Sequence, residues 1–308
     1  MVQKKINPAV LAPKQVIGVL MVMLGAVGFA SKAIMVKLLY LHQLDATSIL
    51  TLRMLFSAPF FVGVIGYYWP KVSFFQFSLR DRWLIVLMAF MGYYLSSLLD
   101  FMGLRYLSAG LERLILFIYP TIVILIVAVR FHQPITRTQV YALLLTYAGI
   151  AVALFADVSL AGGHVWFGAL LIFCSALAYS TYIVGSGQLI PRVGSSMLYT
   201  SYIMVFATVP IVLQFLILQP SNLFNFTGEV YQITGWMALI ATIIPAMLTA
   251  KGILLIGSGN ASIVGSVGPV STIALAHVFL GEPVLIWQLV GTGLVLAGVL
   301  LIGLRKGK

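Results

Sequence analysis

The chain is 308 residues long, 61% of its residues are hydrophobic, 8% are charged, and its formal net charge is +11. Because soluble domains carry about 25% charged residues, this composition excludes a soluble globular protein. The one cysteine, Cys174, lies inside an apolar run, which excludes disulfides within the chain and cysteine zinc clusters.

Ten apolar runs follow one another along the chain, separated by polar residues or by glycine and proline. The runs are continuously apolar and do not alternate as the strands of a membrane barrel would, so each is predicted to be a helix that crosses the membrane. The sequence therefore predicts an all-α membrane protein with ten transmembrane helices. They cover residues 16–38, 46–67, 84–105, 111–130, 138–156, 165–185, 197–218, 233–254, 261–280 and 285–304.

The basic residues indicate how these helices are oriented. With the N-terminus inside, the outer loops hold essentially one basic residue, Arg105. Lysine and arginine are enriched in cytoplasmic loops, so we expect a multi-pass protein of a bacterial inner membrane with both termini in the cytoplasm. The inner segments then hold Lys4, Lys5, Lys14, Lys71, Arg80, Arg82, Arg130, Arg137, Arg192, Arg305, Lys306 and Lys308.

The second half of the sequence repeats the first. Residues 106–154 align without gaps with 255–303, matching Gly110 with Gly259, Pro120 with Pro269, Pro134 with Pro283, and Gln139 with Gln288. We expect a first repeat at 1–156 (helices one to five) and a second at 157–308 (helices six to ten). Because five is odd, the second repeat must enter the membrane in the opposite orientation. The loss of basic residues from the loop at 279–286, compared with 130–137, agrees with this inversion.

Motifs at the matched positions resemble those of the EamA family of the drug/metabolite transporter superfamily. The second half carries Gly268-Pro269, Phe279-Leu280-Gly281-Glu282-Pro283, Gln288 and Leu296-Ala297-Gly298-Val299. The first half is more divergent, with Leu52-Arg53, Tyr106-Leu107-Ser108-Ala109-Gly110, Tyr119-Pro120 and His132-Gln133-Pro134. The resemblance implies ten helices around a central cavity, lined mainly by the first four helices of each half, and alternating access. It does not specify a substrate, because relatives export amino acids and other metabolites, and some import.

Charged residues inside the predicted helices are functional candidates, because they are costly in a membrane. At a rise of 1.5 Å per residue, Lys32, Arg53 and Asp100 lie roughly 20–24 Å from the cytoplasmic edge, in the outer half of the membrane. They sum to +1 and could attract a carboxylate. The alternative is a structural ion pair of Asp100 with Lys32 or Arg53. Asp100 is also the candidate proton carrier if transport is coupled, whereas Glu112 and Arg113 are interpreted as interfacial residues.

Polar side chains extend this candidate site along two helices. Tyr93, Ser96 and Asp100 share one face of the third helix, and Tyr179 and Tyr182 share one face of the sixth. Tyrosines near helix ends usually anchor a protein at the membrane interface, but Tyr93, Tyr119 and Tyr179 are predicted to lie deeper. The predicted substrate-binding residues are Lys32, Arg53, Tyr93, Ser96, Asp100, Tyr119, Tyr179 and Tyr182.

Pro120 and Pro269 are predicted to kink the fourth and ninth helices, since proline removes a backbone hydrogen bond. Matching kinks in two inverted repeats fit a rocking mechanism. The alternative is that the prolines only shape the helices.

These features favour a secondary transporter of a small polar metabolite, an amino acid or related carboxylate, exported by alternating access. A passive channel or facilitator is the alternative. No catalytic motif, cofactor site or metal site stands out, so we expect neither an enzyme nor a bound cofactor. The expected partners are a small-molecule substrate and membrane lipid, not nucleic acid. A proton or exchanged solute would drive coupling if it exists, and the sequence leaves open a monomer or a homodimer.

Overall fold

The computed structural model describes residues 13–70, 72–131, 137–161, 164–218, 222–265 and 267–305. In these ranges the regular structure is helical throughout, without a strand. The first half contains α1 (Pro13–Leu41), α2 (Ala46–Tyr68), the 3-10 turn η1 (Phe74–Gln76), α3 (Leu79–Ala89), the π-helical turn η2 (Phe90–Leu95), α4 (Ser96–Leu104), α5 (Ala109–Leu116), α6 (Tyr119–Phe131) and α7 (Arg137–Ala161). The second half contains α8 (Val165–Val193), α9 (Ser196–Leu218), α10 (Gly228–Ala238), the π-helical turn η3 (Leu239–Ile243), α11 (Ile244–Gly265), α12 (Val267–Leu280) and α13 (Ile286–Arg305).

Seven helical stretches in the described residues are long and apolar enough to cross a membrane, and three apolar helices are shorter. The structure therefore agrees with an all-α membrane protein. The long stretches are Gln15–Leu41, Ala46–Tyr68, Leu79–Leu104, Ala109–Arg130, Val165–Val193, Ser196–Leu218 and Gly228–Thr249, and the shorter helices are Leu144–Ala153, Val267–Leu280 and Ile286–Gly298.

Short polar side chains fix several helix starts. The Asp45 carboxylate accepts from the backbone N–H of Thr47 at 2.8 Å and of Ser48 at 3.1 Å, so α2 begins at Ala46. The Ser78 hydroxyl accepts from the backbone N–H of Asp81 at 3.1 Å. The third helix consequently begins several residues before the predicted 84, because the prediction followed only the apolar run.

Two helix boundaries differ from the sequence-based expectation. The predicted helix 111–130 is divided into α5 and α6 by a turn at Phe117 and Ile118. The predicted break between 254 and 261 is absent, and α11 continues to Gly265. The turn residues that separate α4 from α5 in the first half therefore have no counterpart break in the second.

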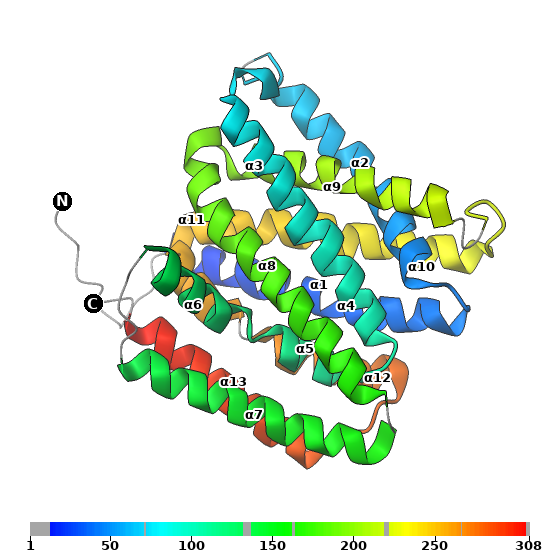
Figure 1. The fold of residues 1–308 in the computed structure, drawn as a ribbon, viewed down its shortest axis with the longest axis vertical. Coiled ribbons are helices and arrows are strands. Elements are labelled where there is room, and N and C mark those ends of the chain that lie inside the picture. Colours follow the sequence, from blue (N-terminus) through cyan, green and yellow to red (C-terminus); the bar gives the residue numbers. More distant parts are fainter. Residues whose placement is uncertain are drawn as a thin grey trace.

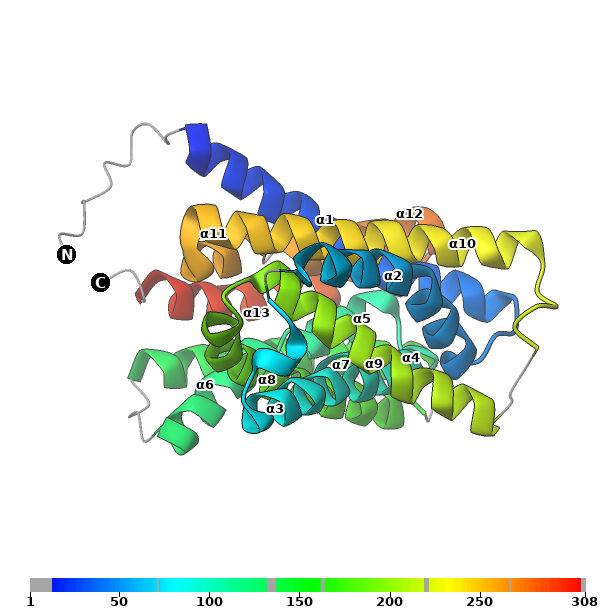
Figure 2. The ribbon, with the colours of Figure 1, turned by 90° about the horizontal axis from the view of Figure 1, so that it is seen from above.

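The helices run back and forth along one axis between two ends of the bundle (Figures 1 and 2). The last residues of α1, α4, α7, α9 and α12 lie at one end, on the right in Figure 1. Those of α2, α6, α8 and α11 lie at the other, together with the start of α1 and the end of α13. Helices α1 and α8, which begin the two halves, start at opposite ends.

A π-helical turn interrupts the same helix in each half. In the register that aligns 106–154 with 255–303, the first residue of η2, Phe90, aligns with the first residue of η3, Leu239. A π turn widens the helix and redirects the side chains that follow it, and such turns are frequent at functional sites. Both π turns contribute to the hydrophobic core, since Ala241 and Ile243 of η3 are buried in it and Tyr93 and Tyr94 of η2 pack against it.

Helices α7 and α13, the last of each half, lie side by side along the lower edge of Figure 1. A Cβ atom added at Gly291 would lie 2.5 Å from the backbone oxygen of Gly149, and the reverse addition would give 2.6 Å. The two backbones therefore approach closely because both residues are glycine.

Candidate functional site

The candidate site is built around Lys32 of α1. Its ammonium group forms an ion pair with the Asp100 carboxylate of α4, and it lies 3.8 Å from Oε1 of Glu112 on α5. The Lys32 side chain is 13% exposed, that of Asp100 is 3% exposed, and that of Glu112 is fully buried. Three helices thus bring one cation and two acids together inside the bundle.

Arg53 of α2 lies next to this group and reaches the second half of the chain. Its Nε donates to Oγ1 of Thr242, in the π turn η3, at 2.9 Å. The guanidinium carbon lies 5.7 Å from the centre of the Phe101 ring, and Lys32 Nζ lies 5.9 Å from the same ring. Although Arg53 is buried, its Nη1 has no hydrogen-bond partner among the described residues. This nitrogen is therefore a buried donor to which the described residues supply no acceptor.

Arg113 connects α5 to two other helices. Its Nε donates to Oγ1 of Thr272 on α12 at 3.1 Å, and its Nη2 donates to the carbonyl of Phe29 on α1 at 2.7 Å. The interpretation of Glu112 and Arg113 as interfacial residues is therefore wrong. The start of α5 lies inside the protein, beneath a loop of the second half, and this burial depends on contacts that the local sequence does not record.

Four tyrosines form a continuous aromatic row beside the charged group. The ring centres of Tyr93 and Tyr182 are 5.5 Å apart, those of Tyr182 and Tyr179 are 5.7 Å apart, and those of Tyr179 and Tyr119 are 5.3 Å apart. The row joins η2, α8 and α6. A Cβ atom at Gly92 would lie 2.4 Å from the Tyr182 ring, so glycine at this position allows η2 to approach α8.

Ser96 takes part in helix packing. Its hydroxyl lies 3.1 Å from that of Ser175 on α8, and the Ser175 hydroxyl donates to the Ser96 carbonyl at 2.8 Å. These bonds hold α4 against α8. Of the predicted substrate-binding residues, Lys32, Arg53 and Asp100 meet around Phe101, the four tyrosines form the row, and Ser96 joins the two helices that carry Asp100 and Tyr182.

The two matched prolines occupy equivalent places in the structure. Pro120 is the second residue of α6, after the turn that ends α5. Pro269 is the third residue of α12, after the end of α11. In the first turn of a helix, proline removes no intrahelical hydrogen bond. Both prolines therefore lie where a long apolar stretch is divided, and not within an unbroken helix.

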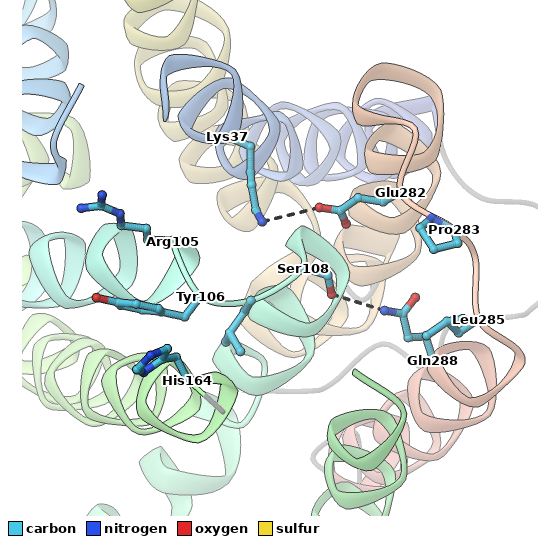
Figure 3. A pocket seen from close by; sticks show the side chains of 10 residues that line it. Lys37, Arg105, Tyr106, Ser108, His164, Glu282, Pro283, Leu285 and Gln288 are labelled. Carbon is cyan, nitrogen blue, oxygen red and sulfur yellow. Dashed lines mark hydrogen bonds and ion pairs between the residues drawn. The ribbon is translucent and has the colours of Figure 1, made fainter. Parts of the chain in front are cut away.

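A pocket of about 460 Å³ opens at the end of the bundle where α4 connects to α5, and Arg105, Tyr106, Leu107 and Ser108 of that connection line it. Figure 3 shows Lys37 and Glu282 pointing toward one another across it, with Nζ and Oε1 3.7 Å apart. Glu282 also accepts from the backbone N–H of Ala109 at 3.1–3.2 Å, and Gln288 Nε2 donates to the Ser108 hydroxyl at 3.3 Å. The second half thus closes over the start of α5.

Sequence reasoning missed this pocket, although Glu282 and Gln288 belong to the repeated motif. The signal was present, since both residues are polar side chains within an otherwise apolar half. Lys37 lies one residue before the end of the predicted helix 16–38, a place where a lysine needs no functional role. Within the described ranges, no three His, Cys, Asp or Glu side chains gather as metal ligands would.

The helical spans, the internal repeat and the charges buried between the spans define a membrane transporter built from repeated helical units. The sequence model of the EamA-like transporter family matches residues 16–155 and 166–304, so the chain belongs to this family. The resemblance seen in the sequence is therefore confirmed, and the chain is an EamA-family transporter of the drug/metabolite superfamily.

Two proteins of Bacillus subtilis (strain 168) are similar to the chain. The uncharacterized transporter YcbK is 29% identical over 299 residues, which cover 94% of this chain and 95% of YcbK. The uncharacterized transporter YyaM is 24% identical over 223 residues, which cover 70% of this chain and 71% of YyaM. A solved crystal structure superposes on the chain with a TM-score of 0.66 at 15% sequence identity. The match covers 95% of this chain and 96% of the chain in that structure, so the two share the fold.

Proposed function

We propose that the chain is a secondary transporter that exports a small polar metabolite with a carboxylate, an amino acid or a related compound, by alternating access. The observation that carries this proposal is the buried, unpartnered Nη1 of Arg53, at a contact between the two halves. A buried guanidinium nitrogen without a partner is costly, and a carboxylate is a suitable acceptor for it.

The roles proposed for individual residues follow from their positions. Arg53 and Lys32 receive the substrate carboxylate, Asp100, the proton candidate of the sequence, holds Lys32 in place, and the tyrosine row of Tyr93, Tyr119, Tyr179 and Tyr182 provides ring faces. Ser96 contributes indirectly to substrate binding, because its bonds with Ser175 hold α4, which carries Asp100, against α8. Pro120 and Pro269 mark the divisions at which helices tilt when the site changes sides.

The proposed architecture has ten spans in two inverted five-helix units, residues 1–156 and 157–308. The opposite starting ends of α1 and α8 support it. The bundle end that carries Arg80, Arg130, Arg137 and Arg192 is proposed to face the cytoplasm of a bacterium, with both termini on that side. The pocket between Lys37 and Glu282 then opens outward.

A passive facilitator is the second candidate function, because the pocket at one end already opens at Ser108, which caps the helix that carries Glu112. Counterflow separates the two functions. Liposomes that hold the purified chain and are loaded with one unlabelled amino acid should transiently accumulate the labelled form if the chain is a carrier. Equilibration without overshoot would favour a facilitator.

The carboxylate site is tested with Arg53→Met, using Arg80→Met at the exposed end as the matched control. Across a panel of labelled amino acids, we expect Arg53→Met to reduce transport by about tenfold or more, because a charged hydrogen bond contributes roughly 1.5–3 kcal/mol. Transport of the corresponding decarboxylated amines should change much less. Equal rates in the two variants for every carboxylated compound would contradict the proposed site.

A further inference from the structure

Two buried carboxyl groups, those of Asp100 and Glu112, share the single ammonium group of Lys32. We propose that Glu112 is a proton-binding residue of this transporter, which holds a proton in the present conformation while Asp100 stays ionised against Lys32. This inference rests on the proposed function, because it adds a coupling proton to the same site.

The contacts of the two acids differ in a way that favours this assignment. Asp100 forms the close ion pair with Lys32, whereas the nearest oxygen of Glu112 lies 3.8 Å from the ammonium nitrogen, beyond a normal hydrogen bond. No N–H or O–H donor of the described residues reaches either Glu112 oxygen, and the group within hydrogen-bond reach of Glu112 is the Asp100 carboxyl, another acid. A fully buried carboxylate without hydrogen bonds is much costlier than a neutral carboxylic acid, so the proton is better placed on Glu112 than on Asp100.

An ionised Glu112 would have no cation of its own, because the cations near it are bound to other groups. Among the described residues, the charged side chains that face it are Lys32 of α1, Asp100 of α4 and its neighbour Arg113 on α5. The Arg113 guanidinium is already bound to Thr272 and to the Phe29 carbonyl. Lys32 is already paired with Asp100. Helices α7, α8, α12 and α13 also pack against α5, but the charged groups that act on Glu112 most strongly come from α1, α4 and α5 itself.

The position of Glu112 gives its proton an exit. Glu112 lies one helical turn from Ala109, whose backbone N–H is bound by Glu282 at the wall of the pocket. Opening of the Lys37–Glu282 ion pair would admit water to that turn. Loss of the Glu112 proton would leave Lys32 shared between two carboxylates. Proton binding therefore changes the positive charge that the site offers to a substrate carboxylate.

Infrared spectroscopy of the full chain in liposomes tests the assignment without a substrate. A protonated carboxyl group has a C=O stretch separate from the carboxylate bands, and a pH titration shows where it disappears. We expect the wild-type protein to show one such buried group and Glu112→Gln to lose it. The matched control, Glu229→Gln, changes an acid whose side chain is 67% exposed and should keep the band.

Two further variants keep the test decisive if Glu112→Gln does not fold. In Asp100→Asn, Lys32 faces Glu112 alone, so the midpoint at which the band disappears should move to lower pH by about one unit or more. In Lys32→Met, the midpoint should move to higher pH, because the favourable cation is gone. Three results would overturn the assignment. The band could persist in Glu112→Gln, or it could be absent at every pH from the Asp100→Asn variant or from the wild-type protein.

Transport measurements separate this inference from the proposed function. If both hold, Glu112→Gln should retain amino-acid counterflow and lose the response to an imposed pH gradient. Transport that still responds fully to the gradient would overturn the coupling role of Glu112, while the carboxylate site would stand. Absence of amino-acid transport in the wild-type protein would contradict the proposed function, but the infrared band would still report on the proton.

Discussion

At the scale of single residues, the charges were the most predictable part of the site. Lys32, Arg53 and Asp100 stand out in the sequence because each interrupts an apolar run, and the structure brings them together around Phe101. Glu112 could not be placed from sequence. Its burial requires α1 on one side and Glu282 from the second half above, and neither contact is recorded in the local pattern.

The ion pair of Lys32 and Asp100 yields the first prediction. Lys32→Met removes the cation that pairs with Asp100, so it should lower the free energy of unfolding by about 3–5 kcal/mol, the usual cost of breaking a buried pair. The double variant Lys32→Met with Asp100→Leu should recover most of that loss. Melting temperatures in detergent measure both, with Lys251→Met, an exposed lysine of α11, as the control.

Transport by the same variants separates a structural role of Lys32 from a binding role. If Lys32 meets the substrate carboxylate, the double variant should regain stability and still transport carboxylated compounds poorly. Recovery of both stability and transport would remove Lys32 from the substrate site.

At the scale of helices, the sequence predicted most spans and missed how they are interrupted. Length and apolarity locate a helix, and a proline indicates where it divides, as at Pro120 after α5. A π turn is a shift of backbone hydrogen bonds within a continuous helix, and no residue type requires it. The bond between Arg53 and Thr242 depends on such a turn, so this contact between the halves could not be predicted.

The second prediction concerns that π turn. Thr242 accepts from Arg53 and donates to the Met237 carbonyl, five residues earlier, at 3.3 Å. Thr242→Val should therefore destabilise the protein by about 2 kcal/mol, because it leaves another buried guanidinium nitrogen without a partner. Thr234→Val is the matched control, since Thr234 is also buried but bonds only to the Val230 carbonyl of its own helix. Equal melting temperatures for the two variants would contradict the role of Thr242.

The third prediction concerns the contact of α7 with α13. Gly291→Ala places a methyl group 2.5 Å from the Gly149 carbonyl oxygen, so the helices must move apart at a cost of about 1–3 kcal/mol. Gly293→Ala, two residues further along α13, meets nothing within 4 Å and should be neutral or stabilising by about 0.5–1 kcal/mol. Detergent melting curves of the two variants test this, and a stable Gly291→Ala protein would show that the helices are not in close contact.

At the scale of the whole molecule, the repeat was visible in sequence because proline, glycine and glutamine at matched positions have backbone or polar roles. The distribution of basic residues predicted which helix ends lie together, and the ends of the described helices follow the same division. The packing of the second half over α5 was not predictable, because the two halves meet through surfaces with no counterpart in the repeat pattern.

The fourth prediction concerns orientation and uses a chain in which Cys174 is replaced by alanine. A cysteine at Asn222, between α9 and α10, should react with a membrane-impermeant thiol reagent added to intact cells. One at Gln76, in η1 at the opposite end, should react only after the membrane is opened. Both positions are exposed, so accessibility alone cannot account for a difference. Labelling of Gln76 from outside would reverse the proposed orientation.

The matched π turns show that the two halves share a backbone irregularity but not a chemistry. Both halves carry the turn at equivalent positions, η2 at Phe90 and η3 at Leu239. The acids have no such partner: Asp100 aligns with Thr249, and Glu112 with Ala261. The widened turn is thus common to both halves, whereas the charged group belongs to one of them, so the asymmetry of the site lies in its side chains and not in its backbone.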